Sequence, residues 1–119
     1  KKVDGRKIPY RILLKDKNIF AFAGIWSINK NFDKPIHTAA IITTAANSFM
    51  KNIHERMPVI LDEDEIKIWL DPTFNQTKHL KLLEPKKHVE MKAYEVSDLV
   101  NQAKNKSKDC ILPKEKTSN

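Results

Sequence analysis

The sequence contains little cysteine and little glycine, and both shortages exclude classes of protein. Its 119 residues include one cysteine, Cys110, so an internal disulfide and a multi-cysteine metal site are both excluded. With two glycines there is no glycine-rich loop of the kind that cradles phosphates in nucleotide-binding proteins. A single cysteine also fits a reducing, intracellular setting.

Long apolar runs and metal-binding motifs are missing as well. No run approaches the roughly 18 to 20 apolar residues that cross a bilayer, so we expect no membrane association. The four histidines show neither HxH nor HExxH spacing, and we therefore expect neither a metal nor another cofactor. Three of them are expected to be structural or solvated: His37, His79 and His88.

The chain is basic, and its charge is unevenly distributed. The net charge is +7, with +5 in residues 1–17, −3 in residues 47–71 and +4 in residues 72–119. Positive ends around a mildly acidic middle suit a polyanionic partner such as nucleic acid, because Lys and Arg side chains bind phosphates. The alternative is that these lysines are simply solvated. The length allows at most one domain.

The apolar pattern predicts an α+β fold in which antiparallel strands dominate. Strands are expected at 9–14, 19–26, 37–43, 57–61 and 89–96, and helices at 49–53, 62–71, 75–83 and 97–103. The first two strands are expected to pair as a hairpin. Asp62 and Glu65 have capping-box spacing, and Pro58 indicates an edge or a bend. Ile111 and Leu112 are expected to anchor the last residues.

The run from Ile42 to Leu61 contains the best candidates for chemistry. His54 precedes Glu55 and Arg56, and an imidazole is the side chain best suited to proton transfer near neutral pH. Thr44 offers a hydroxyl, although a threonine at a strand end more often satisfies the backbone. Arg56 could bind a phosphate or pair with Glu55.

The remaining candidates have more ordinary explanations. Trp26 and Trp69 are expected in the core rather than as stacking platforms. Cys110 is interpreted as a small buried hydrophobe, because no base accompanies it in the sequence.

Six segments, in order, resemble the SOS-response-associated peptidase family, or SRAP domains, which shield abasic sites in DNA. The most specific part is IHERMPVIL following TTAAN. The segments are IFAFAGIWS (19–27), IITTAAN (41–47), IHERMPVIL (53–61), WL (69–70), VSDLVN (96–101) and DCILP (109–113).

The resemblance implies a barrel-like antiparallel fold with a few short helices, of which the N-terminal part is missing here. Residues 1–112 are expected to form the C-terminal portion of one SRAP-like domain, and residues 113–119 a flexible tail. The family's N-terminal cysteine, an asparagine and a glutamate have no counterparts in this sequence, and Cys110 cannot replace the cysteine. The missing half would therefore be required, and we expect a monomer.

The resemblance also implies a mechanism for the DNA-damage response. In the family, the exposed N-terminal cysteine attacks the ring-opened abasic site in single-stranded DNA and forms a thiazolidine crosslink, after self-removal of a propeptide. His54 would act as acid or base, and Thr44, Arg56, Asn47 and Pro58 would lie in the pocket or contact DNA. The expected location is cytoplasmic and nucleoid-associated in a bacterium, or nuclear in a eukaryote. The alternative is a non-catalytic, basic nucleic-acid-binding module.

Overall fold

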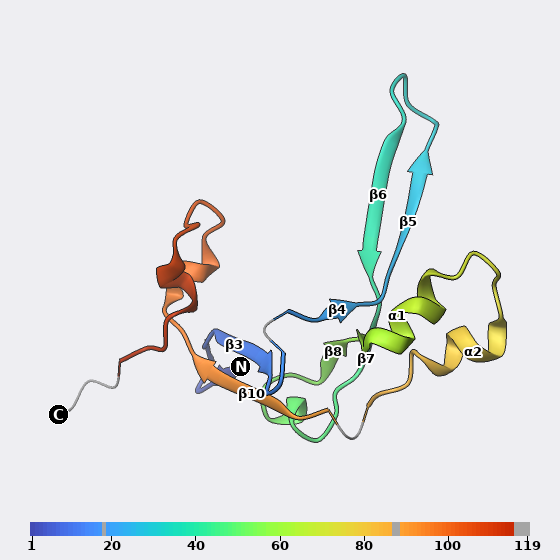
Figure 1. The fold of residues 1–119 in the computed structure, drawn as a ribbon. Helices are drawn as coiled ribbons and strands as arrows, with labels where there is room; N and C mark the ends of the chain where they lie inside the picture. Colours follow the sequence, from blue (N-terminus) through green and yellow to red (C-terminus); the bar gives the residue numbers. More distant parts are fainter. Residues whose placement is uncertain (18, 87–88, 116–119) are drawn as a thin grey trace. The chain divides into compact units, whose positions relative to one another are not determined.

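The computed structural model describes residues 1–17, 19–86 and 89–115, and the chain divides into two compact units (Figure 1). Unit 1 comprises Lys1–Asn18 and Val89–Asn119, and unit 2 comprises Ile19–His88. Each unit has its own strands and short helices, and the run from Ile42 to Leu61 lies entirely within unit 2.

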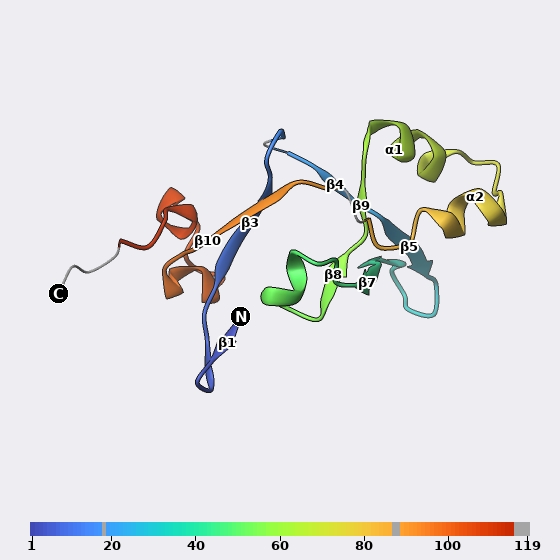
Figure 2. The same ribbon diagram turned by 90° about the horizontal axis from the view of Figure 1, so that it is seen from below.

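Unit 1 is built on an antiparallel ladder between the two ends of the chain. Strand β3 (Tyr10–Leu14) pairs with β10 (Met91–Glu95), and the two run side by side in Figures 1 and 2. A small hairpin, β1 (Lys2–Val3) and β2 (Arg6–Lys7), precedes this ladder. Its turn has positive φ at both Asp4 and Gly5, the conformation that an Asp-Gly pair favours.

The expected hairpin between residues 9–14 and 19–26 is wrong. β3 takes its partner from residues 91–95, and the segment 19–26 is divided between two other ladders. The prediction assumed that neighbouring strands in the sequence pair with each other. A period-two pattern fixes which face of a strand is apolar, but it does not identify the partner strand.

The end of unit 1 is attached differently from the prediction. Ile111 and Leu112 are exposed, whereas Cys110 is buried, as expected. The Tyr94 hydroxyl donates to the Ile111 carbonyl at 2.6 Å, and the Lys114 amide donates to the Glu95 carbonyl at 2.8 Å. Short 3-10 helices, η2 (Asp98–Asn101) and η3 (Lys108–Ile111), lie along this stretch. Residues 116–119 of the expected tail lie outside the described residues.

Unit 2 contains three extended segments, each of which forms two successive strands. Two α-helices and a 3-10 helix complete it. The elements are β4 (Ala21–Phe22), β5 (Gly24–Asn29), β6 (Ile36–Ile41), β7 (Thr43–Ala45), η1 (Met50–Asn52), β8 (Arg56–Pro58), β9 (Ile60–Leu61), α1 (Glu63–Leu70) and α2 (Gln76–Lys81).

The three segments meet at a three-way junction formed by Ala23, Ile42 and Val59. The Ala23 amide donates to the Val59 carbonyl (2.8 Å), Val59 to Ile42 (2.9 Å) and Ile42 to Ala23 (3.0 Å). Ladders β4–β9, β5–β6 and β7–β8 all start from this ring, and the junction residues continue the register of each. Every amide and carbonyl of the ring is thereby paired, which a buried backbone requires.

The core of unit 2 packs around this junction. Ala23 is fully buried and Val59 is 2% exposed, and both cluster with Leu61 and Leu82. Trp69 packs against this cluster, as expected, and its Nε1 donates to the Gly24 carbonyl at 3.1 Å. The prediction for the other tryptophan is wrong, because Trp26 is 73% exposed.

Helix α1 starts with the predicted capping box. The Asp62 carboxylate accepts from the Glu65 amide, while the Glu65 side chain accepts from the Asp62 amide. The hydrogen bond from the Glu65 amide lowers the pKa of Asp62, and the nearby Lys86 ammonium lowers it further. Helix α2 is capped by Asn75, so both helices begin within one residue of their expected positions.

The predicted fold class is confirmed: the chain is α+β, and its strands pair antiparallel. Over the described ranges the strands form five two-stranded ladders and do not close into a barrel. The expected strand 57–61 is interrupted at Val59, where the chain changes its pairing partner from β7 to β4.

The junction leads to a prediction about stability. Ala23→Leu should lower the free energy of unfolding by about 1–3 kcal/mol, because the added atoms have no space at the fully buried centre. Ala40→Leu, at an exposed position of β6, is the matched control and should change stability little. Urea denaturation measures both. Equal effects would contradict a close-packed junction.

Candidate functional site

The candidate residues lie on a hairpin that leaves the junction through Ile42 and Val59. Strand β7 pairs with β8 in the register Thr43↔Pro58, Thr44↔Met57 and Ala45↔Arg56. Pairs alternate between hydrogen-bonded and non-hydrogen-bonded, and the junction pair next to Thr43↔Pro58 is bonded. Pro58 therefore occupies a position at which its missing N–H costs no ladder hydrogen bond.

Asn47 organises the loop between the two strands. It is 7% exposed, its Oδ1 accepts from the Met50 amide at 2.9 Å, and its Nδ2 donates to the Lys86 carbonyl at 3.3 Å. The bond from the Met50 amide closes the turn that leads into η1, whose own N-cap position is Phe49. The side chain thus holds the loop in place from the inside.

His54 is exposed, and its ring is held by the backbone two residues further on. Nδ1 lies 3.0 Å from the Arg56 amide and 3.2 Å from the Arg56 carbonyl. A neutral ring accepts the amide hydrogen and carries its own proton on Nε2, whereas a protonated ring can donate to the carbonyl. Both protonation states therefore have a partner at Nδ1, which suits a residue that gives and takes a proton at Nε2.

Arg56 is held by Thr43 rather than by Glu55. Its Nη2 donates to the Thr43 carbonyl and to the Thr43 hydroxyl, both at 3.0 Å. The two residues are diagonal neighbours on the same face of the ladder. Within the described residues Nη1 and Nε form no hydrogen bond. These donors of the guanidinium are therefore available to bind an anion such as a phosphate.

Thr44 lies on the opposite face of the ladder from Thr43. It is half-buried and pairs with Met57, which is 5% exposed. Side chains alternate along a strand, so neighbouring threonines must point to opposite faces. The hydroxyl beside Arg56 therefore belongs to Thr43.

The structure thus links three exposed residues: the Thr43 side chain contacts the Arg56 guanidinium, and the His54 ring contacts the Arg56 backbone. Sequence reasoning named the second and third but missed Thr43. The alternation of side chains along a strand would have identified Thr43. Arg56 lies on the face opposite to the buried Met57, and Thr43 lies on the same face as Arg56. Asn47 holds the loop of the hairpin through its buried side chain, and Pro58 is part of the β7–β8 ladder.

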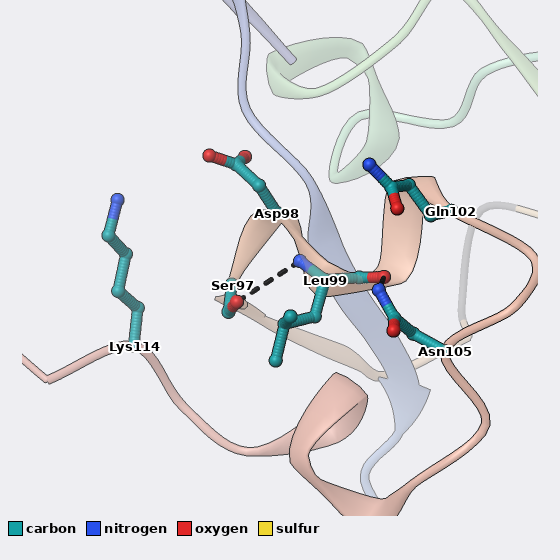
Figure 3. Close-up of a pocket in the computed structure, with 6 residues that line it drawn as sticks. All are labelled: Ser97, Asp98, Leu99, Gln102, Asn105 and Lys114. Atoms are coloured by element: carbon teal, nitrogen blue, oxygen red, sulfur yellow. Dashed lines mark hydrogen bonds between the residues drawn. The ribbon is translucent and has the colours of Figure 1, made fainter.

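Other sites are few in the part of the chain that the structure describes. There, no three His, Cys, Asp or Glu side chains gather as metal ligands, and no helix has the length and apolar character to cross a membrane. Unit 1 has a shallow hollow of about 350 Å³ (Figure 3), where the Ser97 hydroxyl accepts from the Leu99 amide. It is lined by Ser97, Asp98, Leu99, Gln102, Asn105 and Lys114. This lining includes neither a histidine nor a cysteine.

A pair of variants tests the contact between Thr43 and Arg56. Thr43→Val removes one of the two acceptors of Arg56 Nη2 and keeps the carbonyl, so rotation of the guanidinium should become faster, which NMR of the Arg56 side-chain nitrogens measures. Because the contact is exposed, the free energy of unfolding should fall by less than about 1 kcal/mol. Thr44→Val is the control and should leave Arg56 unchanged. A guanidinium that rotates as slowly in Thr43→Val as in the original protein would contradict a contribution of the Thr43 hydroxyl.

The chain matches known proteins over nearly its whole length. The family model described as SOS response associated peptidase (SRAP) matches residues 1–103. The abasic site processing proteins YoaM and YoqW of Bacillus subtilis are each 47% identical to it, over 93% and 88% of this chain. The abasic site processing protein HMCES of Gallus gallus is 38% identical over 67% of this chain.

The relatives are longer than the chain. It spans 50% of YoaM, 48% of YoqW and 24% of the chicken protein. A crystal structure of a protein from Bacteroides thetaiotaomicron superposes on 97% of this chain with a TM-score of 0.83 and 31% identity, and the match covers 52% of that protein. The resemblance seen in the sequence motifs is confirmed, and the chain belongs to the SOS response associated peptidase (SRAP) family.

Proposed function

We propose that this chain is part of a DNA-damage response protein that binds single-stranded DNA and captures abasic sites covalently. The observation that supports this best is the arrangement of His54 and Arg56 on the β7–β8 hairpin. One side chain can move a proton and the other can bind a phosphate, and a contact with the Arg56 backbone links them. YoaM and YoqW, each 47% identical, are abasic site processing proteins.

The proposed reaction joins an N-terminal cysteine to the aldehyde of the ring-opened abasic site. The α-amine adds to the aldehyde carbon, and loss of one water gives an imine. The thiol then adds to the imine carbon, and its proton passes to the nitrogen, which closes a thiazolidine ring. The cysteine would become N-terminal when the protein cleaves off the residues that precede it. This self-cleavage is the proposed peptidase activity.

This chain would supply proton transfer and DNA positioning, but not the nucleophile. His54 would protonate the departing hydroxyl and accept a proton from the amine or thiol through Nε2. Arg56, oriented by Thr43, would bind a phosphate next to the abasic nucleotide. Cys110 is buried and lies within the chain, so neither its amine nor its thiol fits the role. The nucleophile would come from the half of the domain outside the match.

A crosslinking assay tests the proposed chemistry. A polypeptide that joins this chain to the complementary half of an SRAP domain should give a shifted covalent band with abasic single-stranded DNA. His54→Ala should slow the appearance of the band by about a hundredfold, the lower end for the loss of a general acid–base.

Ser48→Ala, at an exposed position of the same loop, is the matched control and should crosslink at the original rate. A band that forms at the same rate in the His54→Ala protein would rule out the proposed role of this histidine. No band with any abasic strand would rule out covalent capture.

The second candidate function is a basic nucleic-acid-binding module without chemistry, which the net charge of +7 favours. The two functions differ in their preference for DNA, which a salt titration of binding measures. Covalent capture predicts tighter association with abasic than with intact strands, and Arg56→Gln should reduce the salt dependence by about one phosphate contact. Equal binding of both strands with no crosslink would favour the module.

A further inference from the structure

Lys86 contacts two different parts of unit 2 at once. Its backbone carbonyl accepts from the Asn47 side chain at 3.3 Å, and its ammonium pairs with the Glu65 carboxylate. Lys86 belongs to neither a helix nor a strand. Its position in the fold therefore depends on tertiary contacts such as these two.

The Glu65 end of this connection is fixed by the start of helix α1. The Glu65 Oε1 accepts from the Asp62 amide at 3.1 Å as part of the capping box, and the Lys86 ammonium binds the same oxygen. Asp62 directly follows Leu61 of β9, which is buried and lies two residues after Val59 of the junction. The carboxylate that binds Lys86 is thus itself held close to the core.

The ion pair between Lys86 and Glu65 is better shielded from water than an ordinary surface pair. The two side chains are 23% and 17% exposed. Water and dissolved ions screen a partly buried pair less than an exposed one, so its attraction persists at physiological salt. A long lysine side chain stays in one conformation only where such an attraction offsets its lost rotamer freedom.

The Asn47 end of the connection leads to His54. The Asn47 Oδ1 accepts from the Met50 amide at 2.9 Å, and the Met50 carbonyl accepts from the His54 amide at 2.8 Å. Both Asn47 and Met50 are buried, so these bonds are sheltered from water. Three successive hydrogen bonds therefore connect the Lys86 carbonyl to the backbone that carries the imidazole.

We propose that Lys86 is a positioning residue for His54. It acts through the loop rather than on the substrate, because it joins the Asn47 side chain at one end to the Glu65 carboxylate at the other. The consequence for DNA capture rests on the proposed function, in which His54 is the acid–base. The order of the loop does not rest on it, and it is measured without DNA.

Two substitutions separate the ion pair from the capping box. Lys86→Met keeps most of the length of the side chain and removes its charge. Glu65→Gln also removes the pair, but its amide oxygen can still accept from the Asp62 amide, because glutamine serves in a capping box as glutamate does. Lys81→Met is the matched control, since it removes the same charge at the exposed end of α2. Lys86→Arg keeps the charge and is the conservative variant.

Hydrogen exchange measures the order of the loop in the polypeptide that joins this chain to the complementary half of an SRAP domain. Lys86→Met and Glu65→Gln should each speed exchange of the His54 amide by about threefold, a typical effect for one ion pair. The double variant should do no more than either single one, because both remove the same contact. Lys86→Arg and Lys81→Met should leave the exchange rate unchanged.

Two outcomes of the exchange measurement would overturn the proposal. The first is exchange in Lys86→Met that is no faster than in Lys81→Met. The second is a double variant in which the effects of Lys86→Met and Glu65→Gln multiply, because the two side chains would then act independently of each other.

The crosslinking rate shows whether this order matters for the chemistry. Lys86→Met should slow crosslinking at saturating abasic DNA by about tenfold, because a misplacement of about 1 Å costs a reaction up to about a hundredfold. The DNA concentration that gives half of the maximal rate should change by less than about twofold. Lys86→Arg should restore the rate, and Lys81→Met should leave it unchanged.

The outcomes of this assay separate the positioning role from the proposed function. A full rate in Lys86→Met despite faster exchange would overturn the positioning role. A change confined to the half-saturating DNA concentration would also overturn it, and would identify Lys86 as a DNA contact instead. If the original protein forms no crosslink, the proposed function fails, and the exchange of the His54 amide alone decides whether Lys86 positions this residue.

Discussion

The ring of hydrogen bonds among Ala23, Ile42 and Val59 is the constraint on which the rest of unit 2 depends. Each residue gives its amide to one partner and its carbonyl to the other, at 2.8–3.0 Å. Three ladders leave this point, and the helices pack around it. Because Ala23 and Val59 are buried, breaking the bond between them would leave unpaired backbone groups without water, which is costly. The junction therefore sets the direction of every strand that starts from it.

The junction fixes the positions of the residues of the candidate site. Thr43 directly follows Ile42, so its hydroxyl and carbonyl start from a fixed position and hold the Arg56 guanidinium. Arg56 in turn holds the His54 ring through its backbone. These side chains are exposed, but each is one or two contacts away from the core. A rigid mount with exposed groups is the arrangement that binding and catalysis require.

Two of the ladders that leave this junction differ in how they are supported. The β7–β8 ladder is short and held by the loop around Asn47, whereas the β5–β6 ribbon extends with all its side chains exposed.

The sequence alone determined the local features. The Asp62 capping box forms as predicted, because it depends on residues within a few positions of one another. The family followed from ordered motifs. Only the tertiary structure decided that β3 pairs with β10, that Trp26 is exposed, and that Thr43 rather than Thr44 holds Arg56. These depend on strand partners distant in the sequence, and the partner decides which face of a strand is buried.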